Sequence, residues 1–316
     1  MKRVAVLDDD DRAALRVRFG GRARFDETLA PLTWWKIGGP ADALVEVQSC
    51  DELAAVLQRV FKRRLPMFVL GSGSNLLVGD GGIRGIVVRL EGDFAALKVR
   101  ADDEGVLVDA GGSASLPALC AQAASLGADG VDGLAGIPAT VGGAVRMNAG
   151  TDREIGEFVR SVSVQTPARP DPHPIDVGWQ YRQSSIPGDA IVAGVSLRFP
   201  FGDPATIRER LQARLVRRKA TQPVAIPNSG SCFRNPDGDR AGRLIEAAGA
   251  KGWREGGAEV SPVHANFIVN TGSASARDVA TLLARVRRAV AERFGVELQL
   301  EVHLVGEFTE AAPCRV

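Results

Sequence analysis

Residues 133–150 read G-L-A-G-I-P-A-T-V-G-G-A-V-R-M-N-A-G, and this stretch decides how the rest of the chain is interpreted. It contains five glycines and one proline, and Arg146 is its only charged residue. It is too apolar for an exposed linker and too rich in glycine for a core helix. Such a composition is expected where the backbone lies against a large, flat, apolar ligand that carries phosphates. Close packing of two lobes of the protein is the alternative explanation.

A second glycine-rich loop, G-S-G-S-N (71–75), directly follows a predicted strand over 65–70. It does not complete a Rossmann fingerprint, because Leu76 occupies the third glycine position and a strand is predicted where a helix should begin. Small residues still let backbone N–H groups converge on a phosphate, and serine hydroxyls add donors. A plain β-turn is the alternative for this loop alone, but two such loops point to one extended cofactor such as a dinucleotide.

The composition is that of an ordinary soluble globular protein, with 45% hydrophobic and 24% charged residues in a chain of 316. The net charge of +1 gives no global field that would recruit nucleic acid or an anionic membrane. The four cysteines form no C-x-x-C pair and the three histidines are scattered, so neither a disulfide framework nor a metal site is predicted. With no signal-like start and no apolar run that could span a membrane, we expect a cytoplasmic protein.

The predicted elements mix strands, short helices and glycine turns without a β-α-β rhythm, which favours an α+β fold over a doubly wound sheet. Residues 1–24 are interpreted as an N-terminal appendage with a short strand over 4–7 and a basic segment. A basic helix is predicted over 205–219. Further on, a capping box at 275–278 begins a helix that ends at Gly295. Alternating apolar residues then predict a strand over 296–304.

The stretch N-S-G-S-C-F-R-N-P (228–236) presents Ser231 on a turn that Gly230 permits. The hydroxyl could be a nucleophile, a proton donor or an ordinary turn residue. No G-x-S-x-G context surrounds it and no histidine is near it in the sequence, so a nucleophile is the poorer interpretation. We expect Cys232 to be a packed neighbour rather than a reactant.

Three other features have ordinary explanations when each is taken alone. Arg182 follows the only tyrosine, Tyr181, and an arginine after an aromatic residue is usually at the surface. Glu301 would ordinarily be a solvated residue on the polar face of its strand. The arginines of the helix over 205–219 would ordinarily form a solvated face, although they could also meet a diphosphate.

Taken in order, several stretches together resemble one family, the UDP-N-acetylenolpyruvoylglucosamine reductases, which are flavoenzymes of peptidoglycan precursor synthesis. The matching pieces are I-G-G-P-A-D (37–42), G-S-G-S-N-L-L-V-G-D-G-G-I-R-G (71–85), G-I-P-A-T-V-G-G-A-V-R-M-N-A-G (136–150), Y-R-Q-S-S (181–185), S-G-S-C-F-R-N-P (229–236), A-G-R-L-I-E-A-A-G-A-K-G (241–252), V-S-P-V-H-A-N-F-I-V-N (260–270) and L-E-V-H (300–303). Each piece is weak alone, whereas the ordered set is specific.

The resemblance implies an FAD-binding module of the vanillyl-alcohol-oxidase (PCMH) type over 30–200. Two α+β lobes, at about 30–90 and 91–200, would form this module, and a substrate-binding α+β domain would cover 206–316. FAD would be held without a covalent bond, and NADPH would be the hydride donor. The implied cofactor contacts are Gly71, Ser72, Gly73, Ser74, Asn75, Leu76, Ile137, Pro138, Thr140, Gly142, Asn148 and Gly150.

The resemblance also implies the reaction, the reduction of UDP-N-acetylglucosamine enolpyruvate to UDP-N-acetylmuramate. Ser231 matches the group that protonates C2 after hydride reaches C3, and Arg182 and Glu301 match the groups that handle the enol intermediate. No metal is implied, and we expect a monomer without nucleic-acid or membrane partners. The implied substrate contacts are Tyr181, Arg217, Lys219, Asn235, Glu246 and His264.

The chain departs from the family pattern at several positions. Because Tyr181 is the only tyrosine, the tyrosine-bearing lid of one branch cannot be present, and the chain resembles the lid-less, type II-like branch. Thr221 stands where part of the family has a lysine, and His303 where an arginine is frequent. Two alternatives are a flavin oxidase of the same fold and a non-catalytic flavin- or sugar-nucleotide-binding protein. Retention of all three catalytic positions favours the reductase.

Overall fold

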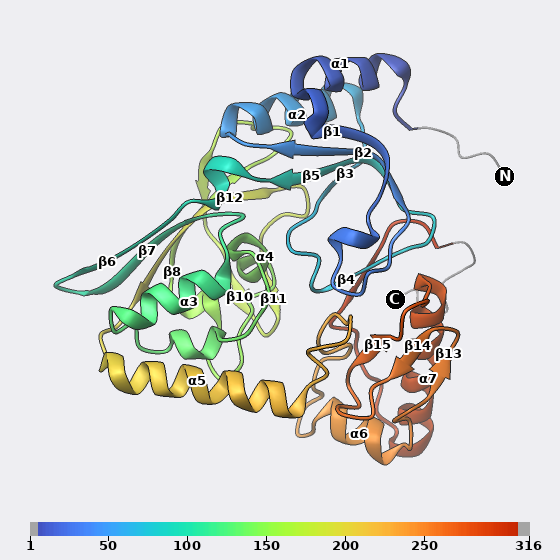
Figure 1. Ribbon diagram of the computed structural model, residues 1–316. Helices are drawn as coiled ribbons and strands as arrows, with labels where there is room; N and C mark the ends of the chain where they lie inside the picture. The colour runs from blue at the N-terminus through green and yellow to red at the C-terminus, as the bar shows by residue number, and fades with distance from the viewer. Residues whose placement is uncertain (1–5, 309–316) are drawn as a thin grey trace. The chain divides into compact units, whose positions relative to one another are not determined.

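The computed structural model describes residues 6–308, which divide into two compact units that are each discontinuous in sequence (Figure 1). The first unit comprises 6–25, 43–72 and 85–217, and the second comprises 26–42, 73–84 and 218–308. The sequence predicts contiguous domains, whereas two segments from the N-terminal part of the chain group with the C-terminal part. The limits of the cofactor and substrate domains therefore stay a prediction.

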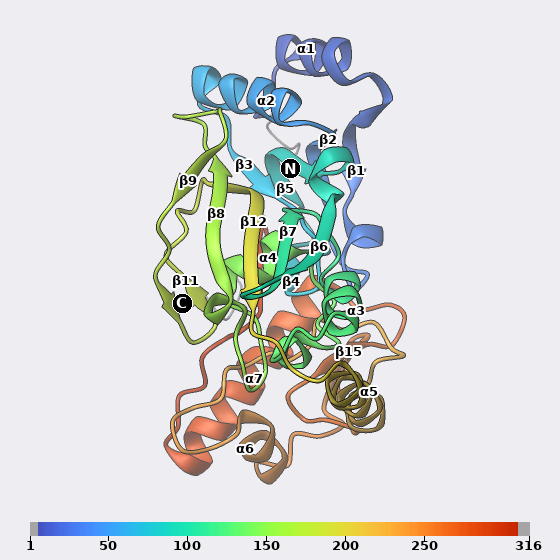
Figure 2. The same ribbon diagram turned by 90° about the vertical axis from the view of Figure 1, so that its left-hand side faces the viewer.

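The first unit begins with helix α1 (Asp9–Phe19), where the sequence predicts a strand over 4–7 and a basic segment. The first two residues of that predicted strand lie outside the described residues, and Val6 and Leu7 are not in a strand. Three acidic residues in the first turn and arginines in the last favour a helix here. Both views show α1 beside α2 (Cys50–Arg63), and Leu7 is buried in the hydrophobic core to which α2 contributes (Figures 1 and 2).

Two sheets build the first unit. The four-stranded sheet has the order β1-β2-β5-β3, from β1 (Ala23–Thr28), β2 (Pro40–Val47), β5 (Ile83–Leu90) and β3 (Met67–Val69). The five-stranded antiparallel sheet has the order β6-β7-β12-β8-β9, and Figure 2 shows its strands side by side. Its strands are β6 (Leu97–Asp102), β7 (Gly105–Gly111), β12 (Ile191–Phe199), β8 (Val159–Gln165) and β9 (His173–Ile175).

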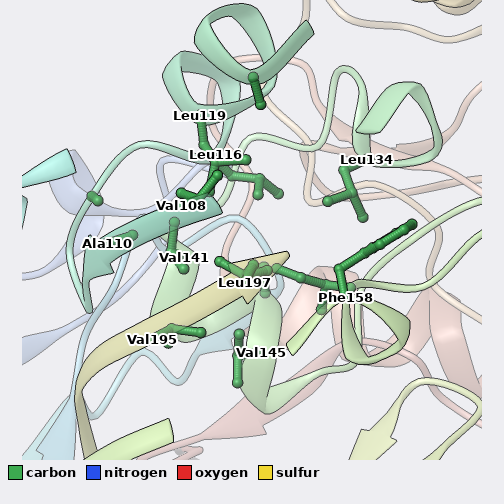
Figure 3. Packing of buried hydrophobic residues seen from close by; sticks show 14 of the residues in the cluster. Val108, Ala110, Leu116, Leu119, Leu134, Val141, Val145, Phe158, Val195 and Leu197 are labelled. Carbon is green, nitrogen blue, oxygen red and sulfur yellow. The ribbon is translucent and has the colours of Figure 1, made fainter. Parts of the chain in front are cut away.

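Each of these sheets has its own hydrophobic core, as expected for a module of two lobes. The core of the five-stranded sheet is shown in Figure 3, where Val108 of β7 and Leu197 of β12 lie near Val141 and Val145. The last two belong to the short helix α4 (Val141–Arg146) of the glycine-rich stretch. The helices α3 (Leu116–Ser125) and α5 (Pro204–Thr221) add further buried residues to this core. The glycine-rich stretch is therefore built into a core.

The second unit contains a three-stranded antiparallel sheet of β13 (Arg254–Glu255), β14 (Ala258–Val260) and β15 (Ile268–Asn270). The helices α6 (Ala241–Ala247) and α7 (Ala276–Phe294) contribute to its core. The predicted capping box of α7 is confirmed, because Ser275 and Asp278 satisfy each other's backbone N–H groups. No helix among residues 6–308 is both long and apolar enough to cross a membrane.

The strand predicted over 296–304 is wrong in extent, because regular pairing is confined to β16 (His303–Val305), which lies parallel to β4 (Leu76–Val78). The predicted alternation is nevertheless present, with Leu298 and Val302 buried and Gln299 exposed. The backbone of this stretch bonds to an irregular segment instead of a strand, since Gln299 accepts from the N–H of Arg234 at 2.9 Å. Alternating side chains thus persist without a regular ladder.

Candidate active site

The first unit contains a cavity of about 320 Å³ at which the two glycine-rich stretches meet, here called the glycine-lined cavity. Gly71 and Ser72 from the first stretch and Thr140 and Gly142 from the second lie in its wall. A Cβ atom added to Gly71 would lie 3.0 Å from Oγ1 of Thr140. The structure therefore brings together four of the predicted cofactor residues.

Close backbone approach explains why glycine occupies this wall. The N–H of Gly142 donates to the carbonyl of Gly112 at 2.9 Å, and a Cβ at Gly142 would lie 2.8 Å from the same oxygen. A Cβ at Gly112 would come within 1.9 Å of the carbonyl oxygen of Val192. A side chain at Gly142 would push α4 away from the turn at Gly112, and one at Gly112 would push that turn away from β12. The glycines thus keep the cavity wall as bare backbone.

The polar groups of the glycine-lined cavity suit a ligand with phosphates. Arg89 and Arg146 both lie in its wall, and Arg89 also pairs with Glu91 at 2.9 Å. Burial lowers the pKa of Arg146, whose guanidinium donates to the carbonyls of Pro187 and Ala190. Ser113 also lines the cavity, and its buried Oγ has no hydrogen-bond partner within residues 6–308. Bare backbone, cations and an unpaired hydroxyl fit the phosphates and flat ring of FAD.

Several of the other predicted cofactor residues do not line the glycine-lined cavity. Ile137 and Pro138 belong to the first unit but are not among the residues that line the glycine-lined cavity, and Ile137 packs against the hydrophobic core. The remainder of the first loop falls in the second unit. There the amide of Asn75 donates to the carbonyl of Glu301 at 3.1 Å, and the Asn75 carbonyl accepts from His303 N–H at 3.1 Å. Gly73, Ser74 and Leu76 share this unit with Asn75.

The side chain of Asn148 is fully engaged within the protein. Its amide donates to Glu154 at 2.5 Å and to the carbonyl of Gln180 at 3.0 Å, and its oxygen accepts from the N–H of Gly156 at 2.9 Å. Asn148 has a positive φ of 42°, a conformation that asparagine tolerates better than most residues. These contacts give the Asn148 side chain a structural role, and its predicted cofactor contact stays a prediction.

Arg182 occupies the tight turn between β10 (Trp179–Gln180) and β11 (Gln183–Ser184), with a positive φ of 57°. Its guanidinium donates to Glu154 at 3.0 Å and to the carbonyl of Gly150 at 2.6 Å. It also lies over the Tyr181 ring at 4.7 Å, which is within the range of a cation–π contact. Arg182 is therefore held in place on several sides, unlike a freely solvated arginine.

Ser231 is half-buried on a turn that the surrounding backbone fixes. Gly230 has a positive φ of 77°, and its N–H donates to Oδ1 of Asn228 at 2.9 Å. The amide of Asn228 donates in turn to the carbonyls of Pro223 and Ile226. On the far side, Cys232 N–H donates to the carbonyl of Asn266 at 2.8 Å. The hydroxyl is presented from a defined position.

Glu301 is attached to the same segment as Ser231, since its N–H donates to the carbonyl of Cys232 at 2.9 Å. With the bond from Asn75, the Glu301 backbone is held at both its N–H and its carbonyl. Cys232 is 1% exposed, and burial raises the pKa of its thiol to about 12, so it fits a packed neighbour. Two of the three predicted catalytic residues thus lie in the second unit, and Arg182 lies in the first.

Three of the predicted substrate residues of the second unit, Asn235, Glu246 and His264, gather around α6. Oδ1 of Asn235 accepts from the N–H of Ala241 at 3.1 Å, and a Cβ added to Gly242 would lie 3.1 Å from Cε1 of His264. Desolvation lowers the pKa of His264, with a further contribution from Lys251. Glu246 pairs with Lys251 at 2.8 Å. Arg217 and Lys219 are exposed near the end of α5.

Sequence reasoning missed four residues of these sites: Glu154, Arg89, Ser113 and Arg146. Glu154 joins Asn148 to Arg182, although it is far from Arg182 in the sequence. Arg89 and Ser113 lie on strand ends and turns without a motif, and only the fold places them in the glycine-lined cavity. Among residues 6–308, no group of three or more His, Cys, Asp or Glu side chains could hold a metal ion.

Comparison with known proteins identifies both halves of the chain. A model described as "FAD binding domain" matches residues 41–168, and a model described as "UDP-N-acetylenolpyruvoylglucosamine reductase, C-terminal domain" matches residues 222–305. The first match lies inside the predicted FAD-binding module. The predicted α+β fold with an FAD-binding module is therefore confirmed.

Several proteins that are similar to this chain over most of its length are named UDP-N-acetylenolpyruvoylglucosamine reductase. The UDP-N-acetylenolpyruvoylglucosamine reductase 2 of Symbiobacterium thermophilum is 46% identical over 296 residues, which are 92% of this chain and 94% of the relative. The Moorella thermoacetica reductase is 45% identical over 285 residues, 89% of this chain and 93% of the relative. The crystal structure of the reductase from Thermus caldophilus has a TM-score of 0.74 at 37% identity, and the match covers 89% of this chain and 97% of that chain. The chain therefore belongs to the UDP-N-acetylenolpyruvoylglucosamine reductase family.

Proposed function

We propose that this protein reduces UDP-N-acetylenolpyruvoylglucosamine to UDP-N-acetylmuramate with NADPH and FAD, and that Ser231, Arg182 and Glu301 are its catalytic residues. One structural observation carries the assignment of roles. The backbone N–H of Glu301 bonds directly to the residue after Ser231, so an acid and a hydroxyl are supported by one irregular segment. The segment over 228–236 contains no histidine that could act as a base, and its thiol, Cys232, is buried and unreactive. The Ser231 hydroxyl is therefore better suited to donate a proton than to attack as a nucleophile.

The residues that would hold FAD are those of the glycine-lined cavity. The chemistry that bound FAD supplies is hydride transfer, from NADPH to the enolpyruvyl group of the sugar nucleotide. The cavity's backbone and its two arginines would bind the phosphates and orient the ring. Gly71 and Ser72 contribute from the first loop, and Thr140 and Gly142 from the second.

The catalytic residues act on the substrate's own charge and proton. Hydride addition at C3 sends the electron pair of the C2–C3 double bond into the carboxylate as an enolate. Arg182, and Glu301 in its protonated form, would stabilise that charge where it develops. Ser231 would then donate its hydroxyl proton to C2 and recover a proton from solvent. A hydroxyl is a weak acid, but the enolate carbon is strongly basic, so position matters more than activation.

The substrate contacts belong to the same proposal. Asn235, His264 and Glu246 around α6, together with Tyr181 and the cations Arg217 and Lys219, would bind the UDP-sugar. The three cysteines of the described chain are free, which fits a reducing, cytoplasmic environment. We also propose that the protein acts as a monomer. The family membership gives no support to a flavin oxidase or to a silent binding protein.

The function is tested by following NADPH oxidation by the purified flavoprotein, with and without UDP-N-acetylenolpyruvoylglucosamine. We expect NADPH to be consumed in equal amount to the UDP-N-acetylmuramate formed, and only when the sugar nucleotide is present. UDP-N-acetylglucosamine, which lacks the enolpyruvyl group, is the matched control and should give no sustained oxidation. Oxidation that does not depend on the enolpyruvyl sugar would overturn the proposal.

A further inference from the structure

The carboxylate of Glu154 accepts hydrogen bonds from both Arg182 and Asn148. One oxygen of Glu154 accepts from the Arg182 guanidinium at 3.0 Å, and the other accepts from the amide of Asn148 at 2.5 Å. The second anchor of the guanidinium is the carbonyl of Gly150, at 2.6 Å. Glu154 therefore links the end of the glycine-rich stretch to the turn that carries Arg182.

The two residues that Glu154 joins both have unfavourable backbone conformations. Arg182 has a φ of 57° and Asn148 a φ of 42°, in the left-handed region that residues other than glycine adopt only rarely. Such conformations persist only where the surrounding contacts enforce them, and they are frequent at functional sites. The carboxylate of Glu154 provides one such contact to each residue.

Glu154 is itself held before any ligand arrives. It lies at the N-terminus of the 3-10 helix η5 (Ile155–Glu157), in a capping box with Glu157. Its backbone N–H donates to Oε1 of Glu157 at 2.7 Å, and its side chain is 23% exposed. This carboxylate holds one guanidinium nitrogen of Arg182 and the carbonyl of Gly150 holds the other, so the planar group is fixed at two points.

We propose that Glu154 is a positioning residue that sets the Arg182 guanidinium in the orientation needed to bind the substrate carboxylate. Its charge does not help by itself, since an anion beside Arg182 weakens the attraction of that cation for another anion. Its contribution is geometric, because a displacement of about 1 Å in a catalytic group can cost roughly 10²-fold in rate. This inference rests on the proposed role of Arg182.

The test compares Glu154→Ala, Glu154→Gln and Glu157→Gln by rapid mixing of each half-reaction. NADPH should reduce the flavin of all three at the wild-type rate, because Arg182 acts only on the enolpyruvyl group. Reoxidation by the enolpyruvyl sugar should slow roughly 10²-fold in Glu154→Ala. Glu154→Gln keeps an acceptor oxygen and should recover to within roughly tenfold of the wild type. Glu157→Gln keeps an acceptor oxygen for the N–H of Glu154 and loses only the charge that faces Arg153, so it should reoxidise normally.

The outcomes separate positioning from general stability. Wild-type reoxidation in Glu154→Ala, or equal slowing in Glu157→Gln, would overturn the inference, and so would a Glu154→Gln protein as slow as Glu154→Ala. If Glu154→Ala loses its flavin or its cooperative thermal transition, Glu154→Gln decides, and reoxidation there that is no slower than in Glu157→Gln would overturn the inference. Arg182→Lys separates this inference from the proposed function: normal reoxidation there would contradict the role of Arg182 itself.

Discussion

Ser231 and Cys232 are neighbours with opposite environments. The serine is half-buried on a turn fixed through Gly230 and Asn228, whereas the cysteine is fully buried and burial raises its thiol pKa to about 12. Thiolate is the reactive form of cysteine, so a thiol with this pKa stays neutral and inert near neutral pH. The chemistry of this segment therefore belongs to the hydroxyl.

Cys232 should resist alkylation in the folded protein. At about pH 8, iodoacetamide should label Cys232 only after denaturation, as read by peptide mass spectrometry. Cys50 is the internal comparison, because it is only half-buried at the start of α2, where burial also raises its pKa. Labelling of native Cys232 faster than Cys50 would contradict the assignment of a packed, unreactive thiol.

His264 should make stability depend on pH. Desolvation lowers its pKa from the ordinary value of 6.5, so the unfolded chain binds a proton at a higher pH than the folded chain. The free energy of unfolding therefore falls as pH drops through 6.5 toward the folded pKa. We expect His264→Gln to lose less thermal stability than the wild type between about pH 7 and pH 5. Equal losses of Tm in the two proteins as the pH falls would show that His264 does not cause this pH dependence.

At the scale of elements, the glycine-lined cavity depends on how closely α4 approaches its neighbours. A Cβ at Gly142 would lie 2.8 Å from the carbonyl of Gly112, which is closer than folded proteins allow. Helix and carbonyl must separate, and the cavity wall moves with them. The energetic cost falls on cofactor binding as well as on folding, because both depend on the same backbone contact.

Gly142→Ala should therefore weaken FAD binding by at least roughly tenfold, measured by fluorescence titration of the flavin-free protein. Gly188→Ala is the matched control, since a Cβ there meets nothing within 4 Å and the residue has no positive φ. The control should bind FAD like the wild type. Equal FAD affinities for the wild type and both variants would show that the close contact between α4 and the Gly112 carbonyl does not shape the cofactor site.

Elements with a clear period or cap were predictable, and those shaped by tertiary contacts were not. The capping box and apolar stripe of α7 predicted its start and its end at Gly295. The helix α1 escaped prediction because its short acidic start lacks a strong apolar stripe and is secured by burial of Leu7 and Leu15. The strand over 296–304 was overestimated, since alternation reports which side chains are buried and not whether a neighbouring strand is available.

At the scale of the whole molecule, the cofactor should stabilise the fold, because the glycine-lined cavity is built from several segments of the first unit that are distant in sequence. A ligand that binds only the folded state adds about 2.7 kcal/mol at a concentration 100 times its Kd. Removing the flavin should lower the Tm, and returning FAD should restore it. Riboflavin, which has the ring but no phosphates, should restore much less. Full recovery with riboflavin would contradict phosphate binding by this cavity.

The site was predictable from the sequence only in part. The ordered motifs indicated the family, and the two glycine-rich stretches do meet at one cavity. The partner of Arg182 could not be predicted, because no local pattern connects Glu154 to a turn formed later in the chain. The sequence also did not predict that the first glycine-rich loop is divided between the two units. Ser72 belongs to the first unit, whereas Asn75 belongs to the second and donates to the carbonyl of Glu301. Such connections arise from the fold and not from neighbouring residues.

The most direct measurement of the central claim is the separation of the two half-reactions in Ser231→Ala. NADPH should reduce its flavin at the wild-type rate, whereas reoxidation by the enolpyruvyl sugar should slow by on the order of 10³-fold, because the proton for C2 is missing. Ser229→Ala is the control, since the buried Oγ of Ser229 has no hydrogen-bond partner in the described chain and both half-reactions should stay normal. Reoxidation of Ser231→Ala at the wild-type rate would contradict the account, as would an equal loss of both half-reactions.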